Sequence, residues 1–210
     1  MILASQSPRR RELLSEAGFD LEIRPADIDE ARLDGESPVE LVARLASQKA
    51  EAARSALDHA PADGLLVAAD TIVWMGSEAL GKPADELDAA RMLRELSGRT
   101  HHVSTGVCAM RLASDASALS AVTFVETTAV TFWELTEAEI LAYVATGEPM
   151  DKAGAYGIQG AGRVLVSGIE GDYANVVGLP VSRLLRELGG LAGNDIDYVA
   201  GAIRIGGPLA

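Results

Sequence analysis

The sequence is poor in cysteine, because Cys108 is the only one in 210 residues. One thiol excludes an internal disulfide framework and any metal site built from several cysteines. The chain also lacks a run that approaches the roughly 20 apolar residues of a membrane-spanning helix. At its start, only a few apolar residues precede the three arginines at 9–11, which is not the pattern of a signal peptide. These absences predict a cytoplasmic protein that does not enter a membrane.

Positive charge is scarce as well. The chain has 18 lysines and arginines against 31 acidic residues, a net charge of −13. Such a surface repels long polyanions, so neither a nucleic acid polymer nor an anionic membrane is expected as a partner. A small anion could still bind where a few basic side chains converge.

What the sequence does contain is typical of an α/β protein. Its hydrophobic share is 48% and it has 21 glycines. The length suits one large domain or two closely joined lobes. Strand-like and helix-like segments alternate along the chain, which favours a mixed β-sheet with helices on its faces.

Local patterns give the expected elements. Ser7-Pro8 and Ser37-Pro38 each combine an N-cap with a proline at the first helical position, and Thr136 with Glu139 forms a capping box. Helices are expected at 8–17, 38–57, 88–96, 137–144 and 180–190. Strands are expected at 1–4, 21–24, 65–75, 102–111 and 121–134, with a hairpin from 164–166 to 173–177. Loops are expected at 25–36, 76–85 and 147–162, and residues 191–210, which show little periodicity, as a loosely attached tail.

The first segment with chemical character is residues 5–11. A helix N-terminus offers free N–H groups and a positive dipole end, where arginines are unfavourable unless an anion binds. A bound phosphate would reverse that penalty, with Ser5 and Ser7 donating hydrogen bonds and Arg9 and Arg10 neutralising charge. An N-cap followed by solvated arginines explains the segment equally well.

A carboxylate, Asp70, ends the apolar strand of residues 65–69. Burying it is costly unless it faces a cleft, a cation or a metal. In open α/β sheets, ligands usually bind at the carboxyl ends of strands, so catalysis or metal binding is favoured over a turn-capping role.

Two loops supply further polar groups. Gly81-Lys82-Pro83 offers a close backbone approach and a mobile charge, although it lacks the spacing of a phosphate-binding Walker A loop. In residues 148–162, Asp151 could hold a metal, Lys152 a phosphate and Gln159 the edge of a base. Solvated charges and turn glycines explain any two of these features, though less easily all of them. In contrast, His101, His102 and Cys108 lack zinc-site spacing, which favours structural roles.

Together these segments resemble the Maf family of nucleotide pyrophosphatases. The matching stretches, in chain order, are LASQSPRRRELL, DIDE, LVARLASQKA, AADTIV, GKPAD, LSGRTHHVSTGV, EPMDKAGAYGIQGAG and GLP. They run from about residue 3 to residue 188, and their combination is far more specific than any one of them. The pattern does not include the residues after 190.

The resemblance implies an elongated mixed β-sheet flanked by helices, with two lobes around a central cleft, similar to inosine triphosphatases and often homodimeric. Residues 1–190 would form this domain and 191–210 a C-terminal tail. Asp70 would be the catalytic proton acceptor. The substrate-binding residues would be Ser5, Ser7, Arg9, Arg10, Lys49, Lys82 and Lys152. A Mg²⁺ or Mn²⁺ ion would be held by Glu30, Asp70 and Asp151.

Three positions distinguish branches of that family: Arg9, Thr71 and Gln159. This trio resembles the branch that hydrolyses dTTP and UTP to the nucleoside monophosphate and pyrophosphate. The branch acting on 7-methyl-GTP replaces the first arginine with an aromatic residue and the glutamine with glutamate. Two alternatives stay open: a pyrophosphatase for modified or non-canonical nucleotides, and a nucleotide-binding regulator of cell division and septum formation.

Overall fold

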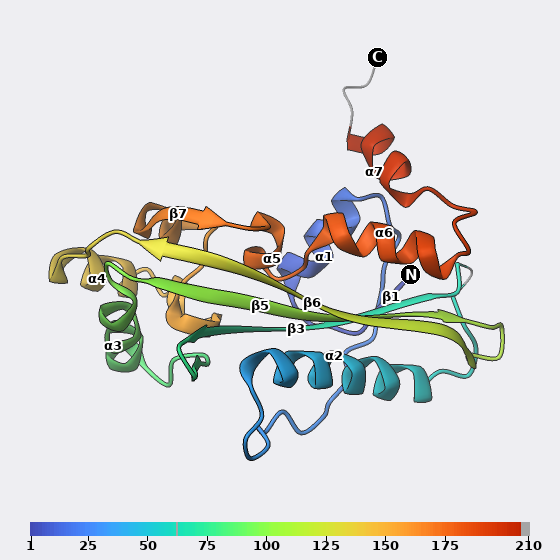
Figure 1. Cartoon of the computed structure of the whole chain (residues 1–210), viewed down its shortest axis with the longest axis horizontal. Coiled ribbons are helices and arrows are strands. Elements are labelled where there is room, and N and C mark those ends of the chain that lie inside the picture. The colour runs from blue at the N-terminus through green and yellow to red at the C-terminus, as the bar shows by residue number, and fades with distance from the viewer. Residues whose placement is uncertain (62, 207–210) are drawn as a thin grey trace.

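A computed structural model describes residues 1–61 and 63–206. One elongated, mixed sheet forms the centre of the molecule, and its three long strands run most of the length of Figure 1. The strand order is β2-β1-β3-β5-β6-β7, and β4 pairs with β3. The pairs β1–β2 and β1–β3 are parallel, whereas the pairs from β3 onward are antiparallel. The predicted α/β architecture is confirmed.

The elements follow one another in a simple order. The strands are β1 (Ile2–Leu3), β2 (Glu22–Ile23), β3 (Leu65–Met75), β4 (Glu78–Leu80), β5 (Thr100–Leu112), β6 (Ala118–Phe132) and β7 (Val166–Glu170). The α-helices are α1 (Pro8–Glu16), α2 (Pro38–Ser55), α3 (Glu86–Leu96), α4 (Glu137–Val144), α5 (Tyr173–Val177), α6 (Val181–Leu191) and α7 (Tyr198–Gly206). Three short 3₁₀ segments, η1 (Glu148–Asp151), η2 (Ala153–Ala155) and η3 (Gly160–Leu165), lie between α4 and β7.

The larger lobe has three layers, with α2 below the sheet and α1 and α6 above it (Figure 1). The first half of β3 explains why its sequence is continuously apolar. Leu65 and Val67 pack in the core shared with α1 and α6, while Leu66 and Ala68 pack in the core shared with α2. A strand covered on both faces needs apolar residues at every position.

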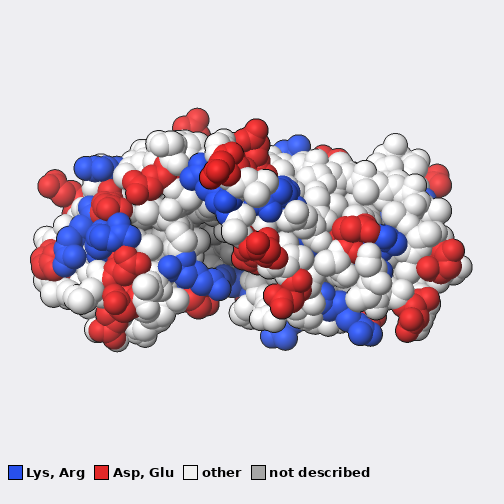
Figure 2. Space-filling view, turned by 90° about the horizontal axis from the view of Figure 1, so that it is seen from below, with Lys and Arg blue, Asp and Glu red and all other residues white. Residues whose placement is uncertain are grey.

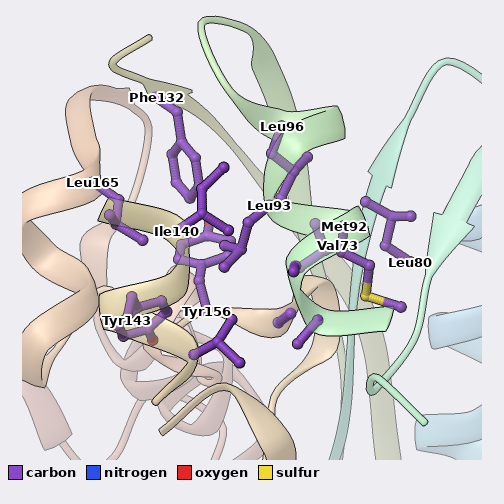
Figure 3. Close-up of a cluster of buried hydrophobic side chains, with 14 of the residues drawn as sticks. Val73, Leu80, Met92, Leu93, Leu96, Phe132, Ile140, Tyr143, Tyr156 and Leu165 are labelled. Atoms are coloured by element: carbon purple, nitrogen blue, oxygen red, sulfur yellow. The ribbon is translucent and has the colours of Figure 1, made fainter. Parts of the chain in front are cut away.

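The smaller lobe is built around the far ends of the long strands. There, α3 and α4 cover the sheet, and a separate apolar cluster joins Val73, Leu93, Phe132, Ile140 and Tyr156 (Figure 3). This cluster fixes the chain that follows α4 against the sheet, because Ala155 and Tyr156 are both buried in it. The cores of the larger lobe pack on the first half of β3, and the cluster of the smaller lobe packs on its far end. The middle of β3 therefore lies between the two lobes.

His101 and His102 have structural roles. His101 is fully buried, its Nε2 lies 2.8 Å from the hydroxyl of Tyr156, and its ring meets Phe132 edge-on. Burial, with a smaller effect from His102, lowers the pKa of His101 to about 4. His102 stacks on Trp74 with ring centroids 4.5 Å apart. Both side chains are used in packing.

Two sequence-based expectations about secondary structure were wrong. Residues 76–85 contain β4, which returns from β3 through a turn at Gly76, whose φ is +63°. The hairpin is absent, because residues 173–177 form α5. Asp172 caps this helix by accepting hydrogen bonds from the N–H groups of Ala174 and Asn175. A local side-chain cap thus outweighs the apolar pattern that favoured a strand.

The segment after residue 190, which shows little periodicity in the sequence, contains a helix. α6 ends at Leu191, and α7 contacts α1 and α6. Tyr198 packs against the core shared by the sheet, α1 and α6, and its ring centroid lies 5.8 Å from that of Phe19. Whether this segment is a separate unit from the domain of residues 1–190 stays a prediction. Within residues 1–61 and 63–206, no helix is both long and apolar enough to cross a membrane.

Gly106 sets the distance between α2 and the sheet. It pairs with Asp70 across the β3–β5 ladder. A Cβ atom at this position would lie 2.2 Å from the carbonyl oxygen of Val42 and 2.8 Å from the nitrogen of Ala43, both in α2. Because backbone atoms of a packed helix cannot yield as a side chain can, only glycine permits this approach.

We expect Gly106→Ala to push α2 away from the sheet. Overpacking of this kind costs about 1–3 kcal/mol, which lowers the melting temperature of a chain of this length by about 3–10 °C. Gly168→Ala is the matched control, since it is also a strand glycine but a Cβ there meets nothing within 4 Å. Thermal unfolding of both variants measures the difference, and equal melting temperatures would contradict the close-approach argument.

Candidate functional site

A cleft of about 830 Å³ opens between the lobes, at the point where the apolar part of β3 ends. Figure 2 shows this face hollowed near its middle, with basic and acidic side chains at the rim of the hollow. Every residue predicted to act in the site lines this cleft: Ser5, Ser7, Arg9, Arg10, Glu30, Lys49, Asp70, Thr71, Lys82, Asp151, Lys152 and Gln159. The fold therefore gathers side chains that are up to 154 positions apart between Ser5 and Gln159.

Asp70 occupies the wall of the cleft in the larger lobe. Its side chain is 17% exposed, and its Oδ1 lies 2.6 Å from the Nζ of Lys49. Lys49 extends from α2 and also lies 2.6 Å from Oε1 of Glu30. The ammonium group thus joins two carboxylates that come from different parts of the chain. Such a pairing compensates the cost of burying Asp70 and engages only one of its two carboxylate oxygens.

Arg10 is committed mainly to the protein. Its Nε donates to the carbonyl of Gly178 at 2.9 Å, and its Nη1 donates to the carbonyl of Ala69 at 2.8 Å and to Ser5 Oγ at 3.1 Å. Its Nη2 donates to Thr71 Oγ1 at 2.9 Å. A guanidinium has five N–H groups, so one is left for a ligand. Burial is the main cause that lowers the pKa of Arg10, and neighbouring Asp70 opposes it.

Arg10 therefore bonds both sequence neighbours of Asp70, because Ala69 precedes Asp70 and Thr71 follows it. Thr71 has a second hydroxyl partner, Thr105 of the neighbouring strand, at 2.9 Å. Thr71 therefore faces a hydrogen-bond network within the larger lobe. Its predicted role in choosing the base would act through Arg10 and its neighbours.

The two serines of the first loop serve local structure as well. Ser7 caps α1, and its Oγ accepts from the N–H of Arg10 at 3.4 Å. Ser5 Oγ accepts from the N–H of Ser7 at 3.2 Å. In the described ranges neither hydroxyl donates to a protein acceptor, so both hydrogens are left for an anion. The capping and the anion-binding interpretations are compatible.

Arg9 connects the lobes. Its Nη1 lies 3.2 Å from Oδ2 of Asp151, in η1 of the smaller lobe, and the Arg9 side chain is 29% exposed. Oδ1 of the same carboxylate accepts from Lys152 Nζ at 2.6 Å. Burial acts to raise the pKa of Asp151, but Lys152 and Arg9 outweigh it and the pKa is lowered. Asp151 is thereby an ionised partner of two cations at the edge of the cleft.

Lys82 and Gln159 complete the lining. Neither side chain has a hydrogen-bond or ion-pair partner in the part of the chain that the structure describes. Their polar groups are therefore directed at solvent or a ligand without competition from the protein. Both belong to the smaller lobe's side of the cleft, opposite Asp70.

The three carboxylates proposed from the sequence as metal ligands are not one cluster. Among the described residues, no group of three or more acidic, histidine or cysteine side chains could hold an ion. Glu30 and Asp70 share Lys49, whereas Asp151 pairs with Arg9 and Lys152. Mg²⁺ usually takes one or two carboxylates together with substrate phosphates, so the Glu30–Asp70 pair fits that donor set and a complete protein cage is not needed.

Several structural partners of the site escaped the sequence analysis. Thr105, Gly178 and Glu148 contact predicted site residues or the loop that carries them. The polar pair Ser104 and Thr105, at buried positions in the middle of β5, is a signal that could have pointed to Thr105. Gly178 lies in the GLP stretch of the family resemblance, but its carbonyl becomes a partner of Arg10 only through the fold.

Comparisons with known proteins agree with this arrangement. A family model described as Maf-like protein matches residues 1–191. The chain is 53% identical over 188 residues to a dTTP/UTP pyrophosphatase of Bacillus cereus (strain AH820), covering 90% of this chain and 93% of that protein. It has the same identity and coverage with the dTTP/UTP pyrophosphatase of Bacillus thuringiensis subsp. konkukian. Identity is 52%, with the same coverage, to that of Bacillus anthracis.

The family match spans the whole cleft, from the Ser5–Arg10 loop to the Gly178 carbonyl, and the relatives are more than half identical to this chain. The chain belongs to the Maf family.

Proposed function

We propose that the protein hydrolyses dTTP and UTP to the nucleoside monophosphate and pyrophosphate. The observation that carries this is Asp70, a largely buried carboxylate in the middle of β3, in a cleft where basic side chains from several segments converge. A protein of net charge −13 has no general affinity for anions, so a convergence of basic groups in one hollow indicates a specific polyanionic ligand. The names of the relatives, which are over half identical, supply the nucleotides.

The cations would bind the triphosphate. Arg9, Lys82 and Lys152 project from three separate segments into the cleft. Charge builds up on the non-bridging oxygens and on the departing pyrophosphate during phosphoryl transfer, and fixed cations stabilise it. Arg9 can leave Asp151 for a phosphate at little cost, because exposed ion pairs contribute only about 0–1 kcal/mol.

Asp70 would accept the proton from water. The water oxygen forms a bond to the α-phosphorus, the bond from that phosphorus to the bridging oxygen breaks, and pyrophosphate leaves with the electron pair. Asp70 takes the proton that the water loses, as a general base. Lys49 orients the carboxylate through the 2.6 Å contact to Oδ1, so that the other oxygen faces the substrate.

A divalent ion fits beside this pair, since Glu30 and Asp70 supply two carboxylates and the substrate supplies phosphate oxygens. When bound, such an ion neutralises phosphate charge and orients the chain of phosphates. Asp151 would keep its role as partner of Arg9 and Lys152.

Base choice would depend on Gln159 and Arg9, which line the cleft from different lobes. The amide of Gln159 can both donate and accept, as the edge of uracil or thymine requires. A site built to make such hydrogen bonds rejects bases that leave its polar groups unpaired.

The first prediction concerns the substrate. Pyrophosphate release from a panel of nucleoside triphosphates should be greatest with dTTP and UTP in Mg²⁺ or Mn²⁺, and chelator should abolish it. Turnover confined to modified nucleotides would retain the mechanism and refute the specificity. No turnover of any triphosphate would favour a nucleotide-binding regulator instead.

The second prediction concerns Asp70 as the general base. Asp70→Asn should lower kcat by about 10²–10⁴-fold, because the amide cannot accept the proton, while nucleotide binding stays measurable by titration calorimetry. Glu126→Gln is the matched control: it removes a strand carboxylate that pairs with Arg183 outside the cleft. Near-normal turnover by folded Asp70→Asn protein would remove Asp70 from the mechanism.

The third prediction concerns selectivity. Gln159→Glu removes the amide donor from the cleft and should reduce the preference for dTTP and UTP over other triphosphates by about tenfold or more. Gln48→Glu introduces the same charge at an exposed position of α2, where Gln48 accepts from Arg44, and should leave the preference unchanged. The ratio of kcat/KM values across the panel is the measurement, and an unaltered ratio in Gln159→Glu would exclude this role.

A further inference from the structure

Glu148 lies beneath the loop that carries Gln159. It is the first residue of η1, and its carboxylate is directed into the loop formed by residues 157–162. Oε2 accepts from the N–H of Ala161 at 2.9 Å, and Oε1 accepts from the N–H of Gly162 at 3.3 Å. The hydroxyl of Tyr143 also donates to Oε1, at 3.0 Å.

Tyr143 extends this contact to the other side of Gln159. Its oxygen accepts from the N–H of Gly157 at 3.1 Å while its hydrogen is donated to Glu148. The ring itself is buried in the apolar cluster of the smaller lobe, where Figure 3 shows it beside Tyr156. The backbone on both sides of Gln159 is thus attached, through Glu148 and Tyr143, to a rigid core.

The loop closes directly onto the carboxylate. A Cβ at Gly160, whose φ is +62°, would lie 2.6 Å from Glu148 Oε2, and one at Gly157 would lie 2.7 Å from Cε of Lys152. Burial acts to raise the pKa of Glu148, but its hydrogen bonds and Lys152 outweigh this and lower it. An ionised carboxylate accepts all three hydrogen bonds, whereas an amide would turn a donor toward one of them.

The backbone of the same residue holds a cation. Lys152 Nζ donates to the carbonyl oxygen of Glu148 at 2.6 Å, and the lysine chain runs under Gly157. One residue therefore organises two parts of the cleft: its side chain fixes the segment with Gln159, and its carbonyl fixes Lys152. In the described part of the chain Gln159 has no hydrogen bond from its own amide, so its placement depends on this backbone.

We propose that Glu148 is a positioning residue for base recognition: its carboxylate sets the loop of residues 157–162 so that the amide of Gln159 meets the pyrimidine edge. This rests on the proposed function, in which Gln159 faces the base. Glu148 does not touch the substrate. Its removal should therefore affect recognition of the base, and not the attack on phosphorus at Asp70.

The test is Glu148→Gln. KM for dTTP and UTP should rise about tenfold, the cost of losing a charged hydrogen-bond acceptor, with kcat changed by less than about twofold. Triphosphates with other bases should be little affected, so selectivity should fall by the same factor. Titration calorimetry should show weaker binding of UMP and unchanged binding of pyrophosphate.

Glu139→Gln is the matched control. Glu139 also accepts a backbone N–H, that of Thr136, but it caps α4 and lies outside the cleft. It should lower stability without changing selectivity. Tyr143→Phe removes the hydroxyl partner while preserving the ring, so it should shift selectivity in the same direction as Glu148→Gln and by less.

Two further measurements separate positioning from general damage. In a double-mutant cycle, Glu148→Gln should add little to the selectivity lost in Gln159→Ala, because both act through one amide. Hydrogen exchange at the amides of Ala161 and Gly162 should accelerate in Glu148→Gln. A uniform loss for all bases, additive effects in the cycle, or unchanged exchange would each overturn the proposal.

Failure of the proposed function gives a different result. If wild-type protein cleaves neither dTTP nor UTP, the function is wrong, whereas the exchange experiment still reports whether Glu148 holds the loop. If wild-type protein cleaves both and Glu148→Gln keeps full selectivity, only the positioning role fails.

Discussion

The contact between Lys49 and Asp70 depends on how closely α2 approaches the sheet. Gly106 permits that approach, and it stands opposite Asp70 in the β3–β5 ladder. Lys49 lies two turns further along α2 than Val42, whose carbonyl would meet a side chain at Gly106. The ammonium group consequently reaches Asp70 with a 12% exposed side chain, in a setting where water screens the pair weakly. The packing distance between a helix and a strand thus becomes an electrostatic property of the site.

Arg10 fixes Asp70 from the side of the first loop, as Lys49 does from the side of α2. It joins the first loop, both neighbours of Asp70 and the carbonyl of Gly178, so four hydrogen bonds hold the middle of β3 against the first loop and the start of α1. A partly buried guanidinium is tolerable only with its donors satisfied, and the remaining N–H faces the cleft. Arg10 therefore contributes positive potential to the site, although most of its donors stabilise the protein. Its neighbour Arg9 is held by one exposed ion pair, which it can exchange for a phosphate.

The sequence predicted those features that depend on local chemistry. The Ser7 and Ser37 caps, the doubly buried apolar run of β3 and the location of Asp70 at its end all follow from short patterns, and all were found. Features that depend on distant partners were missed. Residues 173–177 were predicted as one arm of a hairpin, but the Asp172 side chain caps them as a helix. The bonds of Arg10 require residues 69 and 178 to meet it in space. Local chemistry singled out most of the cleft residues one segment at a time, but Glu30, Lys49 and Thr71 were identified only through family motifs, because no local pattern brings together loops from two lobes.

The division of the site between lobes has a chemical consequence. Asp70 and Lys49 belong to the larger lobe, whose core is shared by β3, α1, α2 and α6, whereas Lys152 and Gln159 belong to the smaller lobe. Each group is rigid within its own lobe, because Asp70 is held through Arg10 and the Gln159 loop through Glu148. The ion pair of Arg9 and Asp151 joins the lobes at the cleft but is exposed, so it gives little resistance to an anionic ligand that binds Arg9 and Lys152, the two cations paired with Asp151. A nucleoside triphosphate is long enough in charge and shape to engage both groups at once. In the proposed function, its base would be read by the smaller lobe while its α-phosphate is presented to Asp70 in the larger lobe.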